Sequence, residues 1–390
     1  MGKKRVAILL PWLKMGGTNK VALRFIKQLA EFCDVTLILS QDTGELKNEV
    51  PKGVRVVVDT MKDFKDILKE DVLKVRIGYI IKDILYYTRI KFHKDSIDNY
   101  KYLVKRHPMI CEESFDCAIT YHGQSPERLL NLVYRIKAYK KVAWIHGEMS
   151  FSPEDCKKMA KYYLNLDHFF FVSNPTMEAF IKRIKVDEKK CTVYYNPLDY
   201  KEILDLAQLP LSTSFDGSFL NILTVGRISH EKGQDMIPEI TRNLLDMGYR
   251  VRWYVIGDGD ARPRLEELIQ KYQVENNVFL LGVQINPYCY MKACDIYVQP
   301  SYTEGYSTTI CEAGILGKAI VGTEQSGGIR DQISDGEDGL IVQATVAGLT
   351  NGIVEMIENE DLRNRFENMI QKKDFSGNGE IEKFLKFLFE

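Results

Sequence analysis

Two short segments in the second half of the chain place charged side chains next to glycines, directly after apolar runs. The first contains Arg227 and Lys232, and the second contains Glu304 and Glu312. Two cations close together on one loop can bind the same diphosphate and stabilise the negative charge that develops on a departing phosphate group. Carboxylates accept hydrogen bonds from the adjacent hydroxyls of a ribose or another sugar. The two segments therefore predict a site for a diphosphate and for sugar hydroxyls.

The second segment also predicts the start of a helix at Thr308. A helix that begins after a glycine and small hydroxyl residues presents backbone N–H groups and the positive end of its dipole to an anion. The amides expected to contribute are those of Gly305, Tyr306, Ser307 and Thr308. The spacing of Glu304 and Glu312 is not specific in itself, because other glutamate pairs in the chain share it. Only this pair combines a preceding strand, a glycine-containing turn and a helix start.

Short apolar runs alternate with helical stretches along the chain, which predicts an α/β fold with parallel sheets covered by helices on both faces. In the first half the expected strands are 6–10, 34–39, 54–58, 116–121, 141–145, 168–172 and 192–195. In the second half they are 221–225, 251–256, 278–281, 295–299, 319–322 and 340–342. Each run is nearly continuously apolar, as expected for a strand buried on both faces.

The length of 390 residues and a polar segment near residue 210 predict two doubly wound domains that face each other across a cleft. The expected domains are 1–199 and 200–374, with a C-terminal helix at 375–390 that crosses back to the first domain. Ligands bind beyond the carboxyl ends of parallel strands, so the strand-to-helix loops are the expected place for chemistry.

The net charge of −1 conceals two halves of opposite charge. Residues 1–200 hold 35 Lys and Arg against 25 Asp and Glu, and residues 201–390 hold 18 against 29. The basic first half predicts an anionic partner, but the absence of nucleic-acid-binding motifs argues against nucleic acid. Eight scattered cysteines and no apolar run of roughly 20 residues predict a cytoplasmic protein with reduced thiols and no membrane-spanning helix.

Several motifs together strongly resemble the C-terminal domain of glycosyltransferase family 4. They are GR-x3-EKG, IGDG, PS-x2-EGYSTTICEAGILGKAIVGT, SGGIRD and DGEDGLIV. The resemblance is dense over 220–345 and looser in the first half, at 15–17, 144–147 and 195–197. It implies the GT-B fold, two Rossmann-like domains, with an acceptor-side first domain and a nucleotide-sugar-binding second domain. It also implies transfer that retains the anomeric configuration.

The resemblance implies a role for each matching residue. Arg227 and Lys232 are similar to the pyrophosphate-binding pair, Glu304 to the residue that contacts the donor sugar, and Glu312 to the residue that binds the ribose. Val283 matches the position where the backbone meets the base, and His146 the histidine near C6 of the donor sugar. Gly16 and Gly17 lie on the first loop, where the backbone can approach the phosphates or the acceptor. Tyr306, Ser307 and Thr308 replace an apolar residue and a proline found in many relatives, which leaves the donor sugar open.

These observations predict a retaining glycosyltransferase that uses a nucleotide diphosphate sugar, UDP-linked, and neither a metal nor another cofactor. Asp258 and Asp260 form a D-x-D string that we interpret as an ordinary loop after a strand. The expected acceptor is a glycan or a lipid-linked sugar of cell-surface polysaccharide synthesis. The basic, amphipathic stretch 61–107 predicts peripheral binding to an anionic membrane surface or, equally, a helical cover of the first sheet. A nucleotide-sugar epimerase of GT-B fold and a catalytically silent binding partner are the alternatives.

Overall fold

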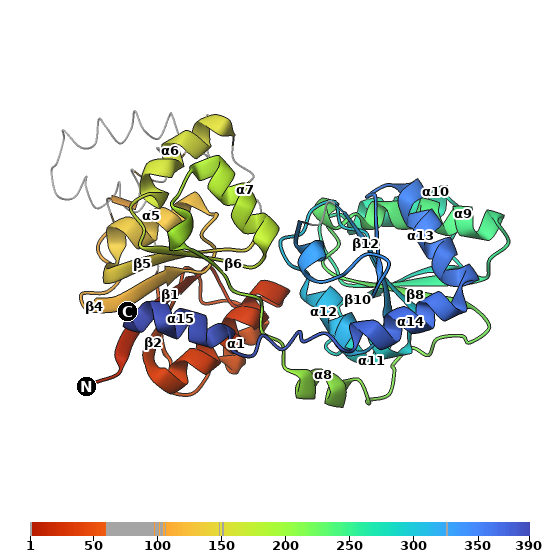
Figure 1. The fold of residues 1–390 in the computed structure, drawn as a ribbon, viewed down its shortest axis with the longest axis horizontal. Helices are drawn as coiled ribbons and strands as arrows, with labels where there is room; N and C mark the ends of the chain where they lie inside the picture. The colour runs from red at the N-terminus through yellow and green to blue at the C-terminus, as the bar shows by residue number, and fades with distance from the viewer. Residues whose placement is uncertain are drawn as a thin grey trace, which may run out of the picture. The chain divides into compact units, whose positions relative to one another are not determined.

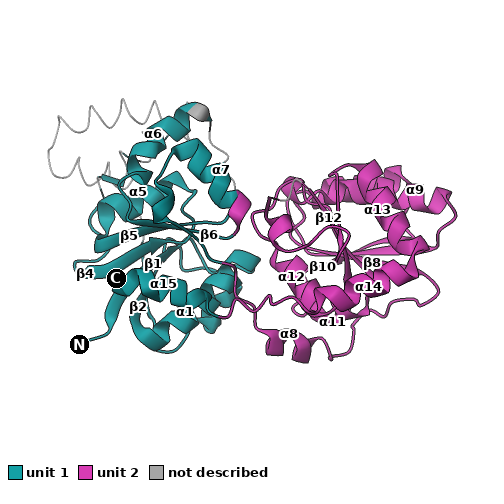
Figure 2. Cartoon of the chain, in the orientation of Figure 1, with its two compact units in different colours: residues 1–172, 176–194, 379–390 teal, residues 173–175, 195–378 magenta. Residues whose placement is uncertain are grey.

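The chain divides into two compact units, each with a parallel sheet at its centre (Figure 2). The computed structural model describes residues 2–59, 107–147, 149, 152–324 and 327–390, together with 97, 101, 104 and 105. Unit 1 comprises Met1–Val172, Thr176–Tyr194 and Gly379–Glu390, and unit 2 comprises Ser173–Pro175 and Tyr195–Asn378. Nearly all of the predicted basic stretch 61–107 lies outside the described residues.

Unit 1 contains a seven-stranded parallel sheet with the order β3-β2-β1-β4-β5-β6-β7. Its strands are β1 (Lys4–Leu10), β2 (Cys33–Leu39), β3 (Arg55–Val58), β4 (Ser114–Thr120), β5 (Lys137–Ile145), β6 (His168–Phe171) and β7 (Cys191–Val193). The predicted strands are confirmed. They could be recognised because a strand at the centre of a parallel sheet is buried on both faces and is therefore apolar along its length. The prediction that the run 54–58 is buried on both faces is wrong. This run forms the edge strand β3, in which Arg55 and Val56 are exposed.

Helices cover both faces of this sheet (Figure 1). They are α1 (Gly17–Phe32), α5 (Pro126–Arg135), α6 (Pro153–Tyr163), α7 (Asn174–Ile184) and α15 (Glu380–Phe389). On the face of α1 and α15, the ring of Phe25 lies 4.8 Å from that of Trp144 and 5.2 Å from that of Phe384. Phe25, Trp144 and Phe384 are all fully buried. The C-terminal helix α15 is therefore part of the unit 1 core.

Unit 2 contains a six-stranded parallel sheet with the order β10-β9-β8-β11-β12-β13. Its strands are β8 (Leu220–Val225), β9 (Val251–Ile256), β10 (Val278–Gly282), β11 (Ile296–Gln299), β12 (Ala319–Thr323) and β13 (Leu340–Val342). These are also the predicted runs, to within a residue at either end. The strand order changes direction between β8 and β11, which is where doubly wound sheets bind ligands.

The helices of unit 2 lie on both faces of its sheet (Figure 1). They are α8 (Tyr200–Leu206), α9 (Ile237–Asp246), α10 (Arg262–Lys271), α11 (Tyr288–Ala293), α12 (Thr308–Ile315), α13 (Val346–Glu358) and α14 (Glu360–Ile370). The fold class predicted from the sequence, two Rossmann-like α/β units, is confirmed. Within the described part of the chain, no helix has the length and apolarity required to cross a membrane.

Candidate functional site

The loops that follow β8 and β11 are tied together by Lys232 and Glu304. The Lys232 ammonium donates a hydrogen bond to the Glu304 carboxylate, and both side chains are largely shielded from water, at 21% and 16% exposure. The Tyr302 amide also donates to the Glu231 carbonyl at 2.9 Å. Two of the predicted site residues, far apart in the sequence, therefore meet at the point where the strand order reverses.

Arg227 lies on the same loop but faces the solvent. Its side chain is 69% exposed and its guanidinium is 2.7 Å from the Glu231 carboxylate, an i,i+4 ion pair. Partial burial acts to raise the pKa of Glu231, but hydrogen bonds and the charges of Arg227 and Lys232 hold that pKa below its usual value. Each of the two predicted phosphate-binding cations thus has its own carboxylate partner within unit 2.

Gly233 allows the two loops to approach closely. Its φ is +66°, and a Cβ at this position would lie 2.1 Å from the Pro300 carbonyl oxygen. A side chain is excluded both by the left-handed backbone and by this contact. The glycine of the EKG motif therefore sets how near Lys232 comes to the loop that carries Glu304.

The start of α12 is held by Gln332, a residue that the sequence did not single out. Ser307 caps the helix, and its hydroxyl accepts a hydrogen bond from the Ile310 amide at 3.4 Å. The fully buried Gln332 amide side chain accepts from the Ser307 N–H at 3.2 Å and donates to the Ser307 carbonyl at 2.6 Å. The Ser307 amide is thus used inside the protein, whereas nothing in the described part of the chain binds the Thr308 and Thr309 amides.

The Gly305 backbone is packed against Gly328. A Cβ on Gly328 would lie 2.1 Å from the Gly305 carbonyl oxygen, and the Gly328 amide donates to the Glu304 carbonyl at 3.3 Å. The SGGIRD motif therefore supports the turn that carries Glu304. Gly328 is the residue of this motif that could have indicated the contact from the sequence.

Glu312 is 8% exposed and lies on the second turn of α12. Its carboxylate accepts a hydrogen bond from the Tyr288 hydroxyl at 3.3 Å. The Tyr306 ring is 5.5 Å from that of Tyr195, and burial raises the pKa of Tyr306 well above its usual value. Tyr306 is therefore a neutral, packed side chain.

Two further predicted positions lie at the ends of β10 and β9. Val283 follows β10 and is 61% exposed. Asp258 and Asp260 occupy the loop between β9 and α10, as predicted. The Asp258 carboxylate accepts from the Gly259 amide at 2.9 Å and lies 3.7 Å from Arg262.

The remaining predicted residues are in unit 1. His146 follows β5, and its ring centre is 4.6 Å from that of Tyr121. Burial lowers the pKa of His146 to about 3, although a backbone hydrogen bond to Tyr121 acts in the opposite direction. Its Nε2 is buried and has no partner among the described residues. Gly17 begins α1, and a Cβ at the preceding Gly16 would meet nothing within 4 Å, so the first loop leaves open space.

Several residues at the edge of the unit 1 sheet that carries His146 were not among the predicted site residues. His122 follows β4 at 5.7 Å from the His146 ring, and Trp12 follows β1 with two cations over its ring. Strands β1, β4 and β5 are neighbours in the sheet. The carboxyl ends of these strands therefore bring the side chains to one edge of the sheet. This proximity depends on the strand order, which the sequence motifs do not indicate.

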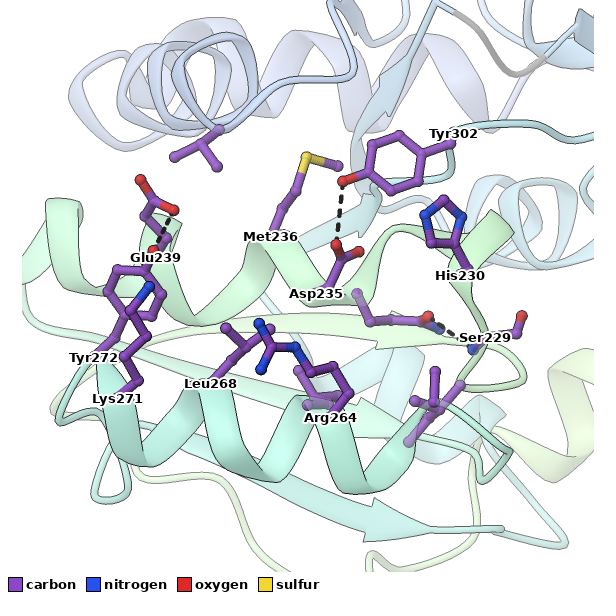
Figure 3. A pocket seen from close by; sticks show the side chains of 15 residues that line it. Ser229, His230, Asp235, Met236, Glu239, Arg264, Leu268, Lys271, Tyr272 and Tyr302 are labelled. Atoms are coloured by element: carbon purple, nitrogen blue, oxygen red, sulfur yellow. Dashed lines mark hydrogen bonds between the residues drawn. The ribbon is translucent and has the colours of Figure 1, made fainter.

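A cavity of about 450 Å³ lies beside the β8 loop (Figure 3). Ser229 and His230 of that loop, Tyr302, and side chains of α9 and α10 line it. The Tyr302 hydroxyl donates to Asp235 at 3.3 Å. None of the predicted site residues lines this cavity, so it is distinct from the Lys232 and Glu304 cluster.

The sequence of unit 2 matches a known enzyme family. Residues 212–373 match the family described as "Glycosyl transferases group 1". An uncharacterized glycosyltransferase, MJ1059, of Methanocaldococcus jannaschii is 25% identical over 318 residues, 70% of this chain and 77% of that protein. The matched residues form a glycosyltransferase domain, and the chain is an enzyme of the transferase class.

A second relative is the N-acetylgalactosamine-N,N'-diacetylbacillosaminyl-diphospho-undecaprenol 4-alpha-N-acetylgalactosaminyltransferase of Campylobacter jejuni. It is 28% identical over 199 residues, so the match spans about half of each chain. Among solved structures, Anabaena Alr3699/HepE in complex with UDP-glucose superposes with a TM-score of 0.72 at 16% identity, covering 99% of both chains. This likeness shows a shared GT-B fold.

Proposed function

We propose that this chain, which carries a glycosyltransferase domain, transfers a sugar from a UDP-sugar to a hydroxyl group of a glycan or lipid-linked acceptor. The proposed transfer retains the anomeric configuration and needs no metal ion. The observation that carries this proposal is the junction of Lys232 and Glu304 at the reversal of strand order in unit 2. A cation, a carboxylate and helix amides converge there, which suits a sugar linked to a diphosphate.

In the proposed donor complex, the Lys232 ammonium binds the diphosphate, and Glu304 accepts hydrogen bonds from the donor sugar. Both groups are present as a pair in the structure, so binding exchanges their mutual contact for contacts to the donor. Arg227 turns from Glu231 to the phosphates, and the Thr308 amide and Glu312 bind a phosphate and the ribose. The backbone of the exposed residue Val283 contacts the base.

The proposed reaction breaks the bond between the anomeric carbon and the diphosphate oxygen, and the electron pair leaves with UDP. The acceptor oxygen forms the new bond on the same face of the sugar. Its proton passes to the departing phosphate, so protons and charge balance without a protein base. Lys232 and Arg227 stabilise the negative charge on that phosphate, which is why no metal is needed. His146 of unit 1 is held neutral by burial, and its role near C6 of the donor sugar is proposed from the family resemblance alone.

The name of the Campylobacter relative describes an acceptor built on a lipid diphosphate. By analogy, we propose that the acceptor of the present chain is used in cell-surface polysaccharide synthesis at the cytoplasmic side of the membrane. The basic composition of residues 1–200 supports an anionic partner for the first half of the chain.

The test is a screen of UDP-, GDP- and ADP-sugars in EDTA, read by thermal stabilisation and by release of the nucleoside diphosphate. We expect UDP-sugars to raise the melting temperature and to be slowly hydrolysed without an acceptor. Glu312→Ala should abolish both effects. Glu267→Ala, an exposed glutamate on α10 paired with Arg264, is the matched control and should change neither.

Three results would contradict the proposal. They are loss of activity in EDTA that Mg²⁺ restores, undiminished activity of Glu312→Ala, and conversion of the UDP-sugar to its epimer without release of UDP. The last result would establish the epimerase alternative.

A further inference from the structure

Two cations of unit 1 lie over one partly buried tryptophan. The Lys14 Nζ is 4.9 Å from the Trp12 ring centre and the Arg128 Cζ is 6.0 Å from it. Trp12 and Lys14 follow β1, whereas Arg128 belongs to the first turn of α5, which follows β4. The cluster therefore spans β1 and β4, where the strand order of the unit 1 sheet reverses.

Neither cation has an ion-pair partner within the described part of the chain. The nearby carboxylates of Glu45 and Glu127 influence Lys14 and Arg128 electrostatically, but neither lies within 4.0 Å of its cation. Glu45 instead accepts a hydrogen bond from the Met15 amide at 2.8 Å. Partial burial lowers the pKa of Arg128, because the charged guanidinium has lost part of its hydration. A partly desolvated cation without a carboxylate favours the binding of an anion.

The histidines next to this cluster are uncharged. Burial lowers the pKa of His122, and its electrostatic interactions with Arg128 and His146 lower it further. His122 and His146 follow β4 and β5, the two strands that come after β1 in the sheet order, so they lie at the same edge of the unit 1 sheet as the cation cluster. Neutral imidazoles offer a hydrogen-bond donor and an acceptor to hydroxyls without adding charge. The edge thus combines an aromatic face, two cations and polar groups suited to a sugar.

We infer that Trp12, Lys14 and Arg128 form an acceptor subsite that recognises a sugar bearing a phosphate or diphosphate. The sugar ring stacks on the indole in place of a cation, and Lys14 and Arg128 bind the phosphate oxygens. This inference rests on the proposed glycosyl transfer and adds the chemical class of the acceptor. A sugar phosphate in solution and a lipid diphosphate headgroup share this chemistry.

The test uses three probes: N-acetylglucosamine 1-phosphate, undecyl diphosphate-linked N-acetylglucosamine and neutral undecyl N-acetylglucosaminide. Trp144 and Trp253 are fully buried, so binding beside the partly exposed Trp12 should appear as a change in tryptophan fluorescence that Trp12→Phe removes. We expect Arg128→Gln and Lys14→Gln each to weaken binding of the charged probes by about 10-fold or more, with no effect on the neutral probe. Binding of the charged probes should also weaken as salt increases.

Lys161→Gln is the matched control, because the Lys161 Nζ lies 5.1 Å from the Tyr162 ring centre on α6, away from this edge. Its binding should equal that of the unaltered protein. Preference for the diphosphate-lipid probe over the soluble phosphate identifies a lipid headgroup as the source, and the reverse identifies a free sugar phosphate. Equal binding of charged and neutral probes, or unchanged affinity in Arg128→Gln, overturns the inference.

Donor hydrolysis without an acceptor separates the inference from the proposed function. Lys161→Gln should hydrolyse the UDP-sugar and use a charged acceptor at the rates of the unaltered protein, whereas Arg128→Gln should lower kcat/KM for the charged acceptor. If the unaltered protein neither binds nor hydrolyses any nucleotide sugar, the proposed function fails, and selective binding of charged probes at Trp12 still decides the subsite.

Discussion

The two units differ in whether the cations near the reversal of strand order have carboxylate partners. In unit 2, Lys232 and Arg227 follow the first strand of the sheet and each is paired with a glutamate of the same unit. In unit 1, Lys14 and Arg128 flank Trp12 without such partners in the described structure. A paired cation gains less from a ligand, because binding must first break an existing contact, but it holds its geometry in advance. The difference predicts a preorganised site in unit 2 and a more adaptable, salt-sensitive one in unit 1.

The largest effect is expected from Lys232→Ala. Lys232 is partly buried and its removal also leaves the Glu304 carboxylate without its partner, so kcat/KM should fall about 10²- to 10³-fold. Arg227→Ala should cost only about 10-fold, since the exposed guanidinium is less well shielded from water. Steady-state kinetics on both variants measures the contrast, and equal losses would show that partial burial of the Lys232 pair has no catalytic consequence.

Preorganisation of the unit 2 site depends on Gln332. Gln332→Ala leaves the Ser307 N–H without a partner and the Ser307 carbonyl with only the Cys311 amide, and it opens a cavity. These losses should lower the free energy of unfolding by about 2 to 4 kcal/mol. Urea unfolding measures this change. Exposed Asn368, whose side chain bonds only the Asn364 carbonyl of its own helix, provides the control Asn368→Ala. A control as unstable as Gln332→Ala would contradict the role of Gln332.

The neutral histidines make unit 1 sensitive to acid. The pKa of His146 is about 3 in the folded chain, against about 6.5 when unfolded. Between these values the unfolded state binds the proton and the folded state does not, so stability is complete above pH 6.5 and falls as the pH decreases toward 3. The loss at pH 5 should be about 1 to 2 kcal/mol. His146→Gln should flatten the pH dependence of the urea midpoint, and an unchanged slope would exclude this origin.

The smallest expected effect comes from releasing Arg227. Glu231→Gln removes the exposed ion pair, which is worth about 0.2 to 1 kcal/mol. UDP-sugar should therefore bind up to about 5-fold more tightly, as measured by calorimetry. Weaker binding would mean that Glu231 serves the donor site rather than competing with it.

The strands were predictable because the central runs of a doubly wound sheet are apolar on both faces, whatever their neighbours. Exposure of Val56 was not predictable, since it depends on β3 lying at the sheet edge. The loops of Arg227 and Glu304 were identified from glycines and charges after strands. Gln332 and the cluster at Trp12 were missed because their roles depend on elements brought together by strand order.

The position of α15 has a consequence for how the chain matures on the ribosome. Fully buried Phe384 completes the core of unit 1, yet α15 is synthesised after the whole of unit 2. Domains generally fold as their residues emerge, so unit 2 can finish first, although its sequence begins later. Until α15 emerges, the aromatic face around Phe25 and Trp144 stays uncovered. The core of unit 1 is therefore complete only after the C-terminal segment has emerged.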